Sequence, residues 1–409
     1  MKTRAYGFSL VELLVSILIG MVAMVFVMRS NVDFEKNRRS GIGGSDAMQN
    51  GVIALFSMEN DAAQAGWGLN DPMLMGCPGR FFDTQNYANG NASLGVAFNY
   101  APVTVAFNGA NPDQIQFISG NSEAGTGSVG LAGAAVTAGA TVLSTDSSPT
   151  YAYRAGDVLL LAPNIATSGA GAGIQPGPCA IAQVAATPVG NSLSVVNDGT
   201  LNSRFNRPAG LLTGFSGSSQ TRIYNLGQGN ALSFHTWDVS NGVLRLRATD
   251  LGGASQTPVS AVSGIVSIKA LYGFDTRPAA PGAVVCQILN YQPDCGVRVT
   301  QWSAGMIDAD ASGVIDSLDV QRLVAVRLAV VARSRQVDKP AAGAVSCTAS
   351  IPANAALPTV FSTQEPAGIA TVPIQVNVAV AGDTVDWSCY HYRTYEAIVP
   401  LRNSGWKPS

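Results

Sequence analysis

An apolar run of 21 residues near the N-terminus constrains this chain more than any other feature. From Phe8 to Met28 the only charged residue is Glu12. As an α-helix this run is roughly 31 Å long, which matches the thickness of a bilayer core. Lys2 and Arg4 precede it, and basic residues before a spanning segment remain in the cytoplasm. The sequence therefore predicts one spanning helix with a cytoplasmic N-terminus and the remaining chain on the other side of the membrane.

The residue that signals cleavage precedes this run instead of following it. An ordinary secretory signal ends in a small-residue cleavage site after its apolar segment. Here the segment ends in Val27, Met28 and Arg29, whereas Gly7 stands directly before Phe8. Cleavage after Gly7 would leave the apolar helix in the product.

The stretch MKTRAYGFSLVELLVSILIG resembles the N-terminus of type IV prepilins. The resemblance implies that prepilin peptidase cuts between Gly7 and Phe8, and that Phe8 becomes N-methylated. It also implies that Glu12 pairs with the N-terminal amine of a neighbouring subunit. A carboxylate within a bilayer segment costs about 2.5–3.5 kcal/mol or more, so a function is its default interpretation. The alternative is a plain signal anchor whose Glu12 stays at the membrane interface.

A helical pattern continues after the spanning segment, over residues 29–66. It is interrupted at Gly41-Ile42-Gly43-Gly44, and Ser45 or Asp46 could cap its restart. The glycines either allow one long helix to stretch or form a short loop between two helices. Apolar residues then recur at helical spacing, and we expect them to form a stripe against a sheet: Met48, Val52, Leu55, Phe56 and Ala62.

The remaining residues, 67–409, have the pattern of a β-rich head. The chain is 47% hydrophobic and only 12% charged and has 44 glycines, as is typical of loop-rich extracytoplasmic proteins. Asn241-Gly242 separates two strand-like runs and predicts a hairpin. Residues 120–220 are rich in Gly, Ala and Ser and indicate a large insertion. Strands are predicted at 114–118, 158–162, 222–226, 231–239, 243–248, 264–272, 323–332, 374–379 and 391–399.

Several internal segments resemble the PilW-type minor pilins, which are related to the GspJ pseudopilins of type II secretion. The segments are AMQNGVIALFSMENDAAQAGWG at 47–68, YNLG at 224–227, ALYGFDT at 270–276, VAVRLAVVARS at 324–334 and YRTYEAIVPLRNSGW at 392–406. This resemblance implies an α+β, type IV pilin-like fold, in which a long N-terminal helix packs on an antiparallel β-rich head with large insertions.

Six cysteines without a C-x-x-C pair favour disulfides in an oxidising compartment over a zinc site. They allow 15 connectivities, which the sequence alone does not distinguish. Proximity favours Cys286 with Cys295 first and Cys347 with Cys389 second, and Cys77 and Cys179 complete the set. One or two of the six could instead be buried thiols.

Few residues carry chemistry. The two histidines, His235 and His391, belong to no nucleophile, metal or phosphate-loop motif, so no enzyme activity is predicted. A net charge of −2 argues against a nucleic-acid partner.

One acidic segment, residues 308–319, follows the spacing of an EF-hand or dockerin-type calcium loop. Ca²⁺ would take side-chain oxygens at the first, third, fifth, ninth and twelfth positions and a backbone carbonyl at the seventh. An Asp at the twelfth position shortens the usual bidentate arm. The competing interpretation is a solvated acidic turn in which Asp316 caps a helical turn. The candidate ligands are Asp308, Asp310, Ser312, Val314, Asp316 and Asp319.

The resemblance implies a minor pilin that primes pilus assembly and sits at the filament tip. Its implied partners are other minor pilins, the major pilin, prepilin peptidase, the inner-membrane assembly machinery and a tip adhesin. It implies an inner-membrane location and then the periplasm and extracellular pilus of a Gram-negative bacterium. A GspJ-like pseudopilin, or an adhesin head on a pilin anchor, are the alternative functions.

Mass spectrometry of the membrane-extracted protein tests the cleavage site. We expect a chain that begins at N-methylated Phe8 in cells with active prepilin peptidase. An intact seven-residue leader in such cells would contradict the prepilin interpretation.

Overall fold

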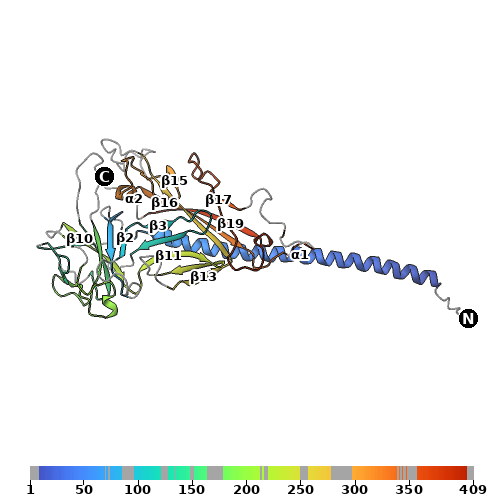
Figure 1. The fold of residues 1–409 in the computed structure, drawn as a ribbon, viewed down its shortest axis with the longest axis horizontal. Helices are drawn as coiled ribbons and strands as arrows, with labels where there is room; N and C mark the ends of the chain where they lie inside the picture. The colour runs from blue at the N-terminus through green and yellow to red at the C-terminus, as the bar shows by residue number, and fades with distance from the viewer. Residues whose placement is uncertain are drawn as a thin grey trace, which may run out of the picture.

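A computed structural model shows a long helix that leads into a β-rich head (Figure 1). Helix α1 (Leu10–Gln64) has 55 residues and is about 82 Å long at 1.5 Å per residue. The Ser9 hydroxyl accepts a hydrogen bond from the Val11 amide and caps its start. The structure describes residues 9–69, 71, 74–84, 96–120, 128–133, 135–147, 152–163, 178–211, 214–215, 220–248, 257–277, 297–338, 340, 343, 347 and 357–402.

Helix α1 has no interruption at its glycines. Residues 41–44 are helical, so the alternative of one long helix is confirmed, and the alternative of a loop with a capped restart at Ser45 or Asp46 is wrong. A glycine inside a helix costs only about 0.5–1 kcal/mol relative to alanine. That cost is too small to end a helix whose flanking turns are well formed.

Two sheets flank the second half of α1. The first is four-stranded, in the order β15 (Gln301–Ser303), β14 (Ile265–Phe274), β16 (Leu323–Arg333) and β19 (Tyr392–Pro400). The second is five-stranded, in the order β13 (Val259–Ser263), β12 (Val243–Arg247), β11 (Ser233–Ser240), β4 (Gln114–Ser119) and β3 (Val103–Ala106). All pairs in both sheets are antiparallel.

A third, six-stranded sheet lies at the end of the head opposite the N-terminus of α1 (Figure 1). Its order is β2 (Val96–Asn99), β1 (Pro78–Phe81), β8 (Cys179–Gln183), β7 (Asp157–Pro163), β10 (Thr221–Gln228) and β5 (Ser128–Gly130). Only β1 and β8 run parallel among these pairs. We call this sheet and its loops the distal lobe.

Shorter elements complete the described chain. They are β6 (Val142–Ser144) paired with β9 (Ser192–Ser194), β17 (Thr359–Val360) paired with β18 (Ile374–Gln375), the helix α2 (Ser317–Gln321), and the 3₁₀ turns η1 (Leu201–Ser203) and η2 (Trp387–Cys389).

Most predicted strands are confirmed, with end points that differ by a few residues. The Asn241-Gly242 hairpin is present, and both residues have positive φ, 52° and 73°. The prediction at 374–379 is only partly right, because regular pairing there ends at Gln375. The insertion at 120–220 supplies β5 to β9, which pair with one another and with β1 and β10 over distances that local patterns do not reveal.

Small residues form most of the face of α1 that packs on the head, with Met58 as a large side chain among them. Ala47, Ala54, Met58 and Ala62 are fully buried in a core shared with β4, β11, β14 and β16. At Gly51 a Cβ atom would overlap the Tyr395 ring of β19. At this position the helix lies so close to β19 that no side chain larger than that of glycine fits.

The predicted apolar stripe on α1 is largely wrong about which residues face the head. Met48, Val52 and Phe56 are exposed, whereas Leu55 is partly buried and Ala62 is fully buried. Hydrophobicity alone favoured the larger residues, but close helix–sheet packing requires small ones.

Two disulfides stabilise the described head. Cys347 with Cys389 confirms a predicted pair, at a Cα–Cα distance of 4.8 Å. Cys77 with Cys179 joins the start of β1 to β8, across 102 residues of sequence. Cys286 and Cys295, the pair favoured first, lie outside the described residues.

A fully buried ion pair connects the two sheets that flank α1. Lys269 on β14 places its Nζ 2.6 Å from Oδ1 of Asp113, which precedes β4, and both side chains are inaccessible to solvent. The same ammonium donates to the Gly109 carbonyl at 2.7 Å. Desolvation raises the pKa of Asp113, and the bond from Lys269 opposes that rise. The pair therefore depends on both partners remaining in place.

Substituting one partner should destabilise the head strongly. We expect Lys269→Met to lower the free energy of unfolding by about 3–5 kcal/mol, because it leaves a buried carboxylate without its cation. The loss should shrink as the pH falls, because protonation of Asp113, whose pKa is already raised, removes the unpaired charge. Denaturant unfolding of the full chain in detergent measures both effects.

Two further variants serve as controls for this prediction. Lys269→Met combined with Asp113→Leu should recover much of the lost stability. Arg245→Met breaks the more exposed pair with Asp238 and should cost no more than about 1 kcal/mol. Equal losses for Lys269→Met and Arg245→Met would contradict the importance of the buried pair.

Candidate functional site

The spanning segment of α1 extends away from the head. Residues Leu10–Asn31 have a mean hydropathy of 2.7, and none of this segment is buried. Among the described helices it alone has the length and composition to cross a membrane. Glu12 lies in its first turn, and the only other charged residue of the segment, Arg29, lies at the far end. Gly7 and Phe8 lie outside the described residues.

The second half of α1 is held to the head by a polar contact as well as by its small residues. One carboxylate oxygen of Asp61, Oδ2, accepts hydrogen bonds from Trp237 Nε1 at 2.7 Å and from His235 Nδ1 at 2.9 Å. Both donors lie on β11, two residues apart, and therefore on the same face of the strand. His235 thus positions the helix, a role that the sequence did not reveal.

The acidic loop follows β15 and ends in the short helix α2. The Asp308, Asp310 and Asp319 carboxylates each place one oxygen within 4.8 Å of the others. Asp316 is not part of this group, because its carboxylate caps α2 and accepts from the Leu318 amide at 2.8 Å. The Ser312 hydroxyl donates to the Val314 carbonyl at 3.0 Å. The structure therefore brings together three of the predicted carboxylate ligands, with the Ser312 hydroxyl 3.5 Å from Asp308 Oδ1, and it confirms the helix cap of the competing interpretation.

Carboxylate oxygens of the loop already accept several hydrogen bonds from backbone amides of the same loop. Asp308 accepts from the Gly313 amide at 2.7 Å and the Ser312 amide at 2.9 Å, and these bonds hold its pKa below the usual range. Asp319 is fully buried and accepts from the Ala309 and Asp316 amides. Burial raises the pKa of Asp319, although these bonds oppose the rise. Clustered oxygen donors of this kind suit a hard divalent cation.

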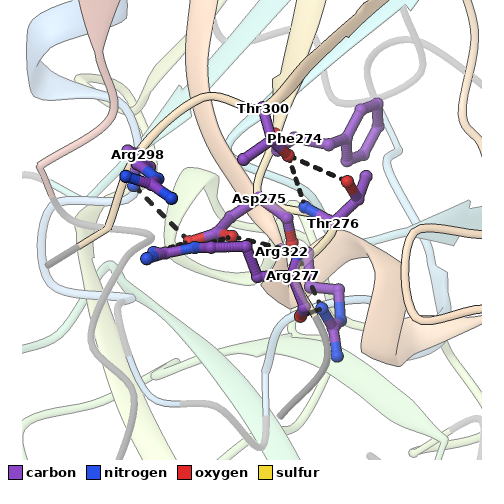
Figure 2. Close-up of polar contacts among 7 residues, drawn as sticks. All are labelled: Phe274, Asp275, Thr276, Arg277, Arg298, Thr300 and Arg322. Atoms are coloured by element: carbon purple, nitrogen blue, oxygen red, sulfur yellow. Dashed lines mark hydrogen bonds and ion pairs between the residues drawn. The ribbon is translucent and has the colours of Figure 1, made fainter. Parts of the chain in front are cut away.

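A cluster of arginines around Asp275 fixes the position of α2 (Figure 2). The buried Asp275 carboxylate accepts from Arg277 Nε at 2.8 Å and Nη2 at 2.6 Å. Arg322, directly after α2, donates from Nη1 to the Asp275 and Arg277 carbonyls at 3.2 and 2.7 Å. Thr300 accepts from the Thr276 amide at 2.8 Å. These contacts join the end of β14 to the end of the helix that closes the acidic loop, and no sequence pattern predicted them.

Two comparisons with known families agree with this architecture. Residues 2–28 match the prokaryotic N-terminal methylation motif. Residues 227–403 match the family described as type IV pilus-assembly protein W. The two matches support a type IV minor pilin-type protein. A type IV pilus context implies other pilus components and prepilin processing in general, and the two matches together point to a structural component of a pilus.

The two matched regions cover separate parts of the chain. The methylation motif covers the spanning segment, and the second match begins within β10 and extends past β19. It includes both the acidic loop and the Asp275 cluster, whereas most of the distal lobe lies outside it. No curated protein sequence and no solved structure matches the chain.

Proposed function

We propose that this chain is a PilW-like minor pilin that primes pilus assembly with other minor pilins and sits at the filament tip. The match of residues 227–403 to the pilus-assembly family is the observation that carries this proposal. It also favours a pilus over a type II secretion system. The spanning helix would lie in the inner membrane with a cytoplasmic N-terminus, and the head would lie in the periplasm before export.

The placement of the distal lobe supports the tip location. The lobe lies at the end of the head farthest from the N-terminus of α1 (Figure 1). In a filament whose subunits share one helix direction, a bulky lobe at that end is best accommodated where no further subunit follows. The adhesin alternative keeps the same placement, with the lobe as the part that meets a surface.

Pilus number and immunogold labelling test this proposal together. Deletion of the gene should reduce surface pili sharply, and labelled protein should appear at filament ends.

Glu12→Val should leave membrane insertion intact, because it removes the one charge from the apolar run. It should lower recovery in sheared pili about tenfold, since a paired intramembrane carboxylate is worth at least ~1.4 kcal/mol.

Ser16→Ala is the matched control for the Glu12 variant. It removes only a hydroxyl that donates to the Glu12 carbonyl at 2.7 Å within the same helix. Its recovery in pili should equal that of the unmodified chain. Normal piliation without the gene, or labelling along whole filaments, would contradict priming and tip location respectively.

We also propose that the loop 308–319 binds Ca²⁺. Asp308, Asp310 and Asp319 would supply carboxylate oxygens and Val314 a carbonyl oxygen. The convergence of three carboxylates within a loop of EF-hand spacing supports this proposal. Bound Ca²⁺ would offset repulsion among these charges and hold the loop to α2.

Calcium-dependent unfolding of the full chain in detergent tests the loop. With a Kd of about 0.1–1 mM, 10 mM Ca²⁺ should raise the free energy of unfolding by about 1–3 kcal/mol. The increment should fall at acidic pH, because the raised pKa of Asp319 favours its protonated form. Asp308→Ala with Asp310→Ala should abolish the increment, and Asp198→Ala, outside the loop, should retain it. An equal calcium-dependent increment in all three proteins would contradict calcium binding by the loop and favour the solvated turn.

A further inference from the structure

A cavity of about 630 Å³ lies where the two sheets that flank α1 meet the distal lobe and the acidic loop. Its walls include Pro78 of β1, Val103 of β3, Tyr272 of β14 and Ile315 of the acidic loop. Most of the residues that line it are apolar, and its volume is typical of ligand pockets, which range from about 300 to 1,000 Å³. The junction therefore has the size and the lining of a binding site.

Strand β3 turns the open edge of the five-stranded sheet toward this cavity. The Ile118 amide of β4 donates to the Pro102 carbonyl at 3.0 Å, and Val103 lies opposite Phe117. In an antiparallel pair this register directs the N–H and C=O of Val103 away from β4. Val103 is only 1% exposed, and no hydrogen bond to either group is found within the described part of the chain. The backbone of a ligand would satisfy both groups.

Tyr272 closes the same edge one step farther along β3. Its hydroxyl accepts a hydrogen bond from the Val105 amide at 2.5 Å, and this amide points to the same side as that of Val103. Burial raises the pKa of Tyr272 to about 12, so the hydroxyl keeps its proton at neutral pH. No acceptor for that proton is found among the residues that the structure describes. The hydroxyl can therefore donate to a ligand, and the part of the strand edge that stays open is short.

An extended peptide matches these features better than a compact molecule does. One residue of an added antiparallel strand would accept from the N–H of Val103 and donate to its C=O. Successive side chains of that strand would point to opposite faces, where the apolar walls of the cavity lie on either side. Only a short stretch would pair, because Tyr272 already occupies the amide of Val105.

Charge indicates which peptides fit. Asp316 is the one charged residue among the described residues that line the cavity. Its carboxylate accepts from the Leu318 amide at 2.8 Å and lies outside the group of three converging carboxylates. A peptide with a basic residue at this wall would complement the carboxylate, and a peptide with an acidic residue there would be repelled.

We infer that this cavity binds a short extended segment of another protein, which is apolar at alternate positions, adds as a strand at Val103 of β3 and places a basic residue near Asp316. The inference goes beyond the proposed function, because it assigns a peptide-binding site to the junction of the sheets with the distal lobe. It depends on neither calcium binding nor tip location.

Fluorescence anisotropy with short blocked peptides tests the cavity on the full chain in detergent. The probes alternate valine and threonine and differ only in one terminal residue, which is lysine, glutamine or glutamate. We expect the lysine peptide to bind about fivefold more tightly than the glutamate peptide, because the two carry opposite charges beside Asp316.

A charge variant tests the role assigned to Asp316. Asp316→Asn keeps a side chain that can cap α2 but removes the negative charge. It should abolish the preference for the lysine peptide and leave the affinity for the glutamine peptide within about twofold. The matched control is Asp198→Asn, at an exposed position of the distal lobe outside the cavity, and it should retain the preference.

A second set of variants tests the cavity itself. Thr104→Trp places an indole at the rim from an exposed position on β3 and should weaken all three peptides about tenfold, whereas Thr104→Ser should bind normally. Ile315→Ser, at a position that is 57% exposed on another wall, should weaken them about threefold. The unfolding transition of each variant separates loss of the site from loss of the fold.

Several outcomes would overturn the inference. These are no peptide binding at about 1 mM probe, equal affinity for the lysine and glutamate peptides, or unchanged affinity in folded Thr104→Trp and Ile315→Ser. Self-association of the chain that Thr104→Trp abolishes, without peptide binding, would assign the cavity to a second copy instead. If Thr104→Trp does not fold, Ile315→Ser alone decides.

Discussion

Close packing of one helix against two sheets is the interaction on which the rest of the head depends. Ala47, Gly51, Ala54 and Ala62 bring α1 near the four-stranded and five-stranded sheets at once. The two sheets do not fully bury their inner faces against each other. The helix fills the remaining space and completes a core that both sheets share. Protein interiors tolerate little change in volume, and this requirement fixes the side of α1 that faces the head.

Buried charges then connect parts that apolar packing alone would leave free to shift. Lys269 and Asp113 join β14 to the segment before β4, and Asp275 with its arginines joins the end of β14 to α2. Such pairs lose hydration when buried, so their contribution to net stability is small or negative. Their directional bonds favour one arrangement of the sheets, which suggests specificity as the reason for their presence.

The helix that anchors the chain has two different faces along its second half. One face is committed to the head, and the other carries large apolar side chains outward on the same continuous helix as the spanning segment. The region matched by the pilus-assembly family forms the four-stranded sheet and three strands of the five-stranded sheet beside this helix, while the distal lobe lies mostly outside the match.

The sequence by itself determined the features that depend on local chemistry. The apolar run with Glu12, the Asn241-Gly242 hairpin and most strands follow from hydrophobic periodicity and turn preferences, which act over a few residues. The pair Cys347–Cys389 was also predicted from the sequence, because the two cysteines are only 42 residues apart. Only the tertiary structure decided which face of α1 meets the head, how strands of the insertion join β1, β2 and β10 in a third sheet, and which carboxylates of the acidic loop converge. Those outcomes depend on contacts between segments that are far apart in the sequence. Examples are Gly51 with Tyr395, Cys77 with Cys179 and Asp275 with Arg322. No local pattern encodes the volume or the partner that a distant segment will supply.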